Sequence, residues 1–149
     1  MFDSRDVAAY IAQECKRREI EYNNTKIQKL LYCSYGVMLA WKDERICEEY
    51  PRLWPYGPVF PKVFKFIHEG KDIATFSTLF EDSATRDQRT VVSRVIDRYG
   101  QFSAVALSEW SHKPHSPWAK TKDEGAPWNS FIPDNYISDY FREHVIARS

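Results

Sequence analysis

The sequence predicts a mainly α-helical protein, a single compact multi-helix domain over residues 1–149 with at most a short two-stranded β element. Apolar residues recur at helical spacing in most segments, whereas the alternation typical of a strand is brief. Capping residues, glycines and prolines bound these helical segments. The 149 residues suffice for one buried core, and they contain neither an internal repeat nor a linker that would divide the chain.

Two helices are expected in the first 42 residues. The first begins at Asp3 or Ser4, and the second begins near Thr25, which has the capping-box spacing to Gln28. The second helix is apolar on most of its faces, which is typical of a central helix with neighbours on several sides. The inward residues of the first helix are Val7, Ala8, Tyr10, Ile11 and Cys15, and those of the second include Ile27, Leu30, Leu31, Tyr35 and Met38.

The next region is expected to change from extended to helical. Residues 44–53 are compatible with an extended segment that leads into Trp54. Pro58 and Pro61 suit a helix start, because proline is tolerated in the first turn, and Gly70 suits the end of that helix.

Residues 71–85 are harder to interpret, and the later segments are again helical. Ala74, Phe76, Thr78 and Phe80 alternate as in a strand, but the run is short and polar, so a loop is an equal alternative. A helix is expected over 87–99 and closes at Gly100. Further helices are expected after Ser103, after Ser116-Pro117 and from about Asp134.

Composition limits the classes of function. The 21 basic and 21 acidic residues cancel, which argues against general nucleic-acid binding. No apolar stretch is long enough to cross a bilayer, and residues 1–6 lack the basic start and apolar run of a secretory signal. Cys15, Cys33 and Cys47 form no CxxC pair and indicate reduced structural thiols. We therefore expect a cytoplasmic protein without membrane contact.

Catalytic and metal-binding signals are weak, and we expect no enzyme activity, cofactor or metal. His112 and His115 lie three residues apart, but Pro114 between them prevents helical face-sharing, and zinc would need two further ligands. Cys33 lies within an apolar helix, where burial disfavours the thiolate. Only five glycines occur in the chain, which leaves little material for a phosphate-binding loop.

Two groups of side chains leave a structural and a functional interpretation open. Trp54, Tyr56, Trp110 and Trp118 lie in two segments rich in aromatic residues and proline, and they either fill the core or contact a partner. The basic residues of the second helix and of the 87–99 region form either a solvated face or a local basic surface for an acidic partner or nucleic acid. These basic residues are Lys26, Lys29, Arg86, Arg89, Arg94 and Arg98.

Four motifs in a fixed order resemble the Panacea domain family, also called the SocA-like antitoxin or GepA phage-associated family. They are Lys26-Ile-Gln-Lys-Leu-Leu-Tyr32, Trp54-Pro-Tyr-Gly-Pro-Val-Phe-Pro-Lys-Val-Phe64, Leu107-Ser-Glu-Trp-Ser-His112 and Pro117-Trp118. The resemblance covers roughly residues 5 to 120. It implies a small, mostly helical protein encoded beside a toxin gene in bacteria, plasmids or prophages.

The resemblance also implies a function and a partner. Some family members neutralise their toxin by binding it, and one delivers its toxin to the ClpXP protease. We therefore expect an antitoxin that binds a cognate toxin encoded by a neighbouring gene. The alternatives are an adaptor that delivers a toxin to a ClpXP-type protease and a DNA-binding regulator of its own operon.

The family carries no catalytic set to transfer, and the oligomeric state is left open. The expected partner-binding residues are those that match the family motifs and could share one surface. They are Lys29, Tyr32, Trp54, Tyr56, His112 and Trp118.

Overall fold

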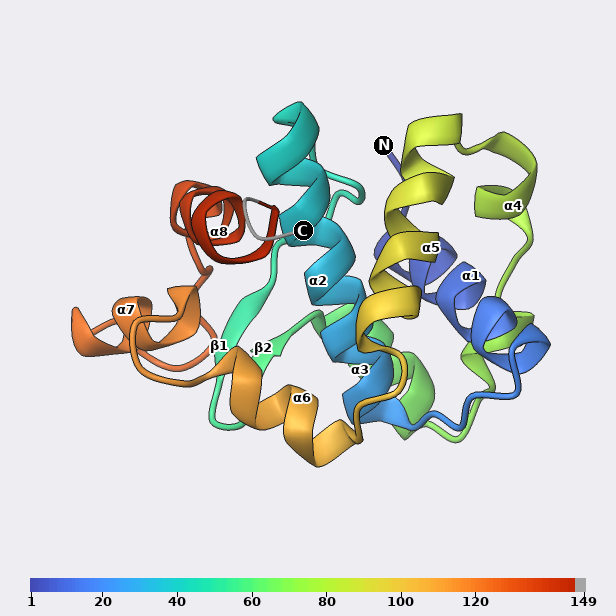
Figure 1. The fold of residues 1–149 in the computed structure, drawn as a ribbon. Helices are drawn as coiled ribbons and strands as arrows, with labels where there is room; N and C mark the ends of the chain where they lie inside the picture. Colours follow the sequence, from blue (N-terminus) through green and yellow to red (C-terminus); the bar gives the residue numbers. More distant parts are fainter. Residues whose placement is uncertain (147–149) are drawn as a thin grey trace.

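The computed structural model describes residues 1–146 and confirms the mainly α-helical fold with one two-stranded antiparallel sheet (Figure 1). The α-helices are α1 (Ser4–Arg17), α2 (Asn24–Lys42), α3 (Pro61–His68), α4 (Leu79–Ser83), α5 (Arg86–Tyr99), α6 (Ala104–Ser111), α7 (Pro117–Asp123) and α8 (Asp134–Phe141). The strands are β1 (Arg52–Trp54) and β2 (Gly57–Val59). A 3-10 turn, η1 (Ile73–Thr75), and a π turn, η2 (Arg142–Ile146), complete the described elements.

Helix α2 is the central element, as its nearly all-round apolar sequence predicts. It contacts α1, α3, α5, α6, α8 and β2. Figure 1 shows it running through the middle of the molecule, with α8 on one side and α1 and α5 on the other. The side chains of Tyr32 and Tyr35 on α2 are among the largest that are fully buried. One core of contiguous apolar side chains therefore surrounds this helix.

Short-range capping signals place most helix starts correctly. Asp3, Ser103 and Ser116 each accept a hydrogen bond from a backbone N–H in the first turn of the helix that follows. The expected capping box of Thr25 and Gln28 is wrong, because α2 begins one residue earlier and Asn23 is its cap. A capping box does occur at Thr85 and Gln88, at the start of α5.

Gln28 has a tertiary role instead of a capping one. Its Oε1 accepts a hydrogen bond from the backbone N–H of Phe60 at 2.8 Å, and its Nε2 donates to the Phe60 oxygen at 3.4 Å. The side chain is 2% exposed and joins α2 to the residue that precedes α3. This partner lies 32 residues away in the sequence, so local spacing could not reveal it.

Residues 71–85 form η1 and α4, so neither the strand nor the loop alternative describes them. The side chain of Asp72 caps η1, and the ring of Phe80 packs 4.9 Å from the rings of both Phe2 and Tyr10. Gln13 of α1 donates to the backbone oxygens of Ala74 and Ser77. Contacts with α1 and the N-terminus thus stabilise a segment whose own pattern is weak.

The first segment rich in aromatic residues and proline, residues 54–59, lies in a β-hairpin. Trp54 pairs with Gly57 at the end of the ladder, and Pro55 and Tyr56 form the turn. Pro58 therefore lies in β2, and of the two prolines expected at a helix start only Pro61 begins α3. Residues 129–132 hydrogen-bond to the other edge of β1, which fixes the hairpin against the body of the protein.

Candidate functional site

A pocket of about 590 Å³ lies between the hairpin turn, the start of α2 and helix α6. Four of the six sequence-predicted partner-binding residues line it: Lys29, Trp54, Tyr56 and His112. The first belongs to α2, the next two to the hairpin and the last to the end of α6. The remaining lining residues are Asn23, Asn24, Thr25, Gln28, Pro55, Val59, Phe64, Ala104, Val105, Ser108 and Glu109.

Lys29 is a buried cation in this pocket. It is 2% exposed, and its Nζ donates a hydrogen bond to the backbone oxygen of Pro58 at 2.9 Å. Burial lowers the pKa of Lys29 to about 8, so the side chain stays charged at neutral pH. Lys26 is also buried, and a solvated basic face is therefore the wrong interpretation for the two lysines of α2.

Gly57 allows the hairpin to lie directly on Lys29. Its φ of +121° is a conformation that side chains with a Cβ rarely adopt. A Cβ at this position would lie 2.6 Å from Ser111 Oγ and 3.0 Å from Lys29 Nζ. The backbone of the turn is further held by Ser108 of α6, whose hydroxyl donates to the Tyr56 oxygen at 2.7 Å.

Aromatic side chains form one wall and the rim of the pocket. Trp54 donates from its indole N–H to Asn129 Oδ1 at 3.0 Å and packs edge-on against Phe64. Tyr56 lies at the tip of the turn and is 80% exposed. Trp118 is buried behind this wall, and its indole N–H donates to the Trp54 oxygen at 2.7 Å. The wall is thus fixed from behind, while Tyr56 faces solvent.

His112 completes the pocket at the C-terminal end of α6. Its ring lies 5.3 Å from the ring of Trp118, centroid to centroid. Its Nδ1 is buried and has no hydrogen-bond partner among the described residues. His115 is exposed, in a left-handed conformation with φ of +70°, and does not line the pocket.

Tyr32 lies in the core, 1% exposed, and does not line the pocket. Its ring packs against those of Trp110 and Phe141, and its hydroxyl is buried without a hydrogen-bond partner in the part of the chain that the structure describes. Trp110 packs against the same core. The second segment rich in aromatic residues and proline, residues 110–118, therefore serves two regions. Trp110 packs against the core, and His112 lines the pocket.

Sequence reasoning missed Ser108 and Glu109, which line the pocket from α6. Both precede His112 by three or four residues, the spacing at which residues share one face of a helix. That spacing was the signal that could have identified them.

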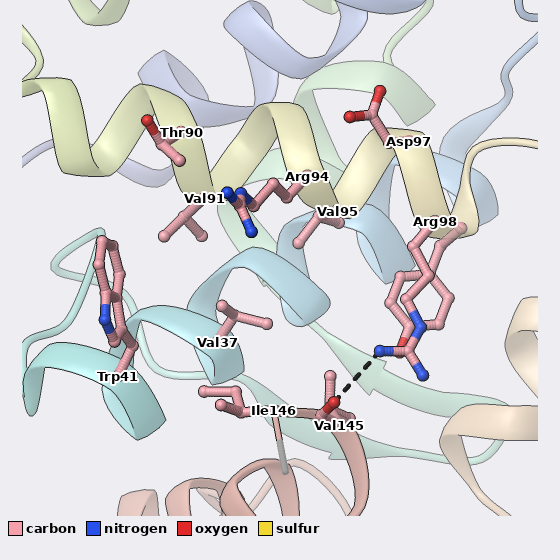
Figure 2. A pocket seen from close by; sticks show the side chains of 11 residues that line it. Val37, Trp41, Thr90, Val91, Arg94, Val95, Asp97, Arg98, Val145 and Ile146 are labelled. Atoms are coloured by element: carbon pink, nitrogen blue, oxygen red, sulfur yellow. Dashed lines mark hydrogen bonds between the residues drawn. The ribbon is translucent and has the colours of Figure 1, made fainter. Parts of the chain in front are cut away.

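A second pocket, of about 540 Å³, lies between α2, α5 and η2 (Figure 2). Figure 2 shows Trp41 at one side of it, Arg94 beside Val91 in the middle, Val37 below them, and Arg98 at the other side. Arg98 donates to the Val145 oxygen at 3.1 Å. None of the six predicted site residues lines this pocket. The pocket at Lys29 is therefore the better candidate site.

Within residues 1–146, no group of three or more His, Cys, Asp and Glu side chains is placed to hold a metal ion. Cys15, Cys33 and Cys47 are unpaired and buried, and burial raises the pKa of each thiol. No helix in the described chain has the length and apolarity needed to cross a membrane.

Comparison with known proteins confirms the family resemblance. A family model described as "Antitoxin SocA-like, Panacea domain" matches residues 27–119, which span the pocket-lining lysine, hairpin and histidine. The chain is 29% identical to the protein named Antitoxin SocA from Caulobacter vibrioides (strain NA1000 / CB15N), over 99% of this chain and 86% of that protein. No solved structure matches the chain significantly. The chain belongs to the SocA-like antitoxin, Panacea domain family.

Proposed function

We propose that this protein is an antitoxin that neutralises a toxin encoded by a neighbouring gene, by binding it directly at the pocket around Lys29. One observation carries the proposal. Four residues that match the family motifs come from three separate parts of the chain and line one pocket. The antitoxin name of the relative supports the same function.

The hairpin turn suits a binding anchor. Tyr56 presents a large amphipathic ring with few rotatable bonds, the kind of side chain that often dominates binding energy. The bonds from Ser108 to the Tyr56 oxygen and from Trp118 to the Trp54 oxygen hold the turn before any partner arrives. A preorganised turn loses little conformational entropy on binding, so more of the contact energy remains as affinity.

A co-expression experiment tests the proposal. The neighbouring gene is expressed with and without this protein, growth is measured, and complex formation between the purified proteins is measured by calorimetry. We expect growth arrest by the neighbour alone, rescue by co-expression, and a stable complex. Rescue accompanied by a shortened toxin half-life would instead indicate delivery to a protease, because direct neutralisation leaves the toxin half-life unchanged. Absence of both rescue and complex would remove the proposal.

A further inference from the structure

We propose that the pocket at Lys29 binds a carboxylate carried by a peptide segment of the partner, with the Lys29 ammonium as its counter-ion. The identity of the partner rests on the proposed function. The chemistry of the site rests on the pocket itself. Three features of its charge and lining support a carboxylate, and a fourth, an acidic residue, supplies a test of the opposite sign.

The first feature is the unsatisfied charge of Lys29. An ammonium group has three N–H donors, and only the Pro58 oxygen accepts from this one among the described residues. No carboxylate in residues 1–146 lies within 4.0 Å of its Nζ to form an ion pair. Buried charges in proteins are normally paired, because an isolated one loses its hydration without compensation. A carboxylate that enters the pocket would supply the missing pair.

The second feature is additional positive potential in the same pocket. Asn24 and Thr25, in the first turn of the 19-residue helix α2, line it. The N-terminus of a helix carries partial positive charge and backbone N–H groups without helical partners. A negatively charged group therefore meets two favourable elements, the Lys29 ammonium and the first turn of α2.

The third feature is the apolar lining, which favours a carboxylate on a peptide over a phosphate. Trp54, Val59, Phe64 and Val105 all line the pocket. Tight phosphate sites rely on arginine forks or on cradles of backbone N–H groups in glycine-rich loops. No arginine among residues 1–146 lines this pocket. One lysine with apolar walls matches a single negative charge attached to apolar groups.

The fourth feature is Glu109, an exposed acidic residue that also lines the pocket. Its negative charge repels anions, so it weakens carboxylate binding and disfavours polyanions such as nucleic acid more strongly. Substitution of Glu109 should therefore change the carboxylate affinity in the opposite direction to substitution of Lys29. Replacement of Glu109 by glutamine should strengthen carboxylate binding, whereas replacement of Lys29 by methionine should abolish it.

Small probes test the site without the partner. Amide chemical shifts of the full-length protein are followed by NMR at neutral pH and low salt. The probes are N-acetyl-glutamate amide for a side-chain carboxylate, N-acetyl-phenylalanine for a terminal carboxylate, their neutral amides, and inorganic phosphate. We expect at least one carboxylate to shift the amides of Gly57, Ser108 and His112 in the millimolar range. Its neutral amide should bind at least about tenfold more weakly.

Two variants test the charges of the pocket, and a third is the matched control. Lys29→Met should remove the carboxylate-dependent shifts, and Glu109→Gln should increase the affinity by about twofold or more. Lys65→Met removes the same charge from an exposed position on α3 and should leave the affinity unchanged. Equal binding of an acid and its amide would overturn the proposal. So would tighter binding of phosphate, or no shifts up to about 50 mM probe.

The outcomes separate this proposal from the proposed function. Probe binding without any complex with the neighbouring gene product would retain the carboxylate site and reject that partner. A complex that depends on Tyr56 but not on Lys29, with no probe binding, would retain the antitoxin function and reject the carboxylate site.

Discussion

At the scale of single residues, the main feature is the position of Lys29. Its side chain is buried beneath the hairpin and donates to the Pro58 oxygen. Desolvation lowers its pKa from an ordinary value of 10.5 to about 8. A buried ammonium therefore lowers the stability of the free protein at neutral pH. A function that uses the charge would explain why such a cost is retained.

Replacement of Lys29 by methionine should stabilise the free protein at neutral pH. Below the folded pKa of about 8, the wild-type lysine is charged in both states and its desolvation cost is fully present. Above that pKa the folded state releases the proton while the unfolded state keeps it until 10.5, so wild-type stability rises relative to Lys29→Met. We expect this relative gain to reach about 2–3 kcal/mol between about pH 7 and pH 10.

Urea unfolding of both proteins across this pH range measures the gain. Using the difference between the two proteins removes the contributions of other groups that titrate in the same range. A stability difference that stays constant with pH would show that Lys29 keeps an ordinary pKa in the folded protein.

The role of Lys29 could be predicted only in part. Its position within a motif typical of the family indicated a functional residue. Its burial could not be read from the helix pattern, because the covering hairpin lies about 29 residues further along the chain. The same reason explains Tyr32, which matched the family motif but packs against Phe141, more than 100 residues away. An aromatic side chain serves a core or an interface equally well, and only the fold decides between them.

At the scale of elements, capping residues and apolar periodicity predicted the features that depend on residues close in the sequence. The caps at Asp3, Ser103 and Ser116, and the central position of α2, follow from capping chemistry and from the apolar pattern. Residues 71–85 could not be predicted, because hydrogen bonds from Gln13 and packing of Phe80 stabilise them.

Packing between α2 and α8 gives a prediction at this scale. A Cβ at Gly36 of α2 would lie 2.5 Å from ring atoms of Phe141, which is fully buried and packs against Tyr32 and Trp110. Alanine would favour the helix by about 1 kcal/mol over glycine, but overpacking of a core costs about 1–3 kcal/mol. We expect Gly36→Ala to lower the melting temperature measured by circular dichroism. A higher melting temperature would show that the α8 contact yields easily.

At the scale of the whole molecule, the pocket arises because the fold brings three parts of the chain together. The start of α2, the hairpin and α6 all line it, and Trp118 of α7 supports it from behind. The order of motifs in the sequence indicated that these segments belong to one family feature. It could not show that they share a pocket, because that depends on how the helices pack around α2.

The central claim is that this pocket is where the partner binds. The most direct measurement compares the affinity of the neighbouring gene product for wild-type protein, Tyr56→Ala and Trp41→Ala by titration calorimetry. Both side chains are exposed aromatics, but Trp41 lines the second pocket. We predict at least about a 30-fold loss of affinity for Tyr56→Ala, as for an interface hot spot, and no change for Trp41→Ala. Unchanged affinity for Tyr56→Ala, or a loss confined to Trp41→Ala, would contradict the claim that the partner binds at the pocket around Lys29.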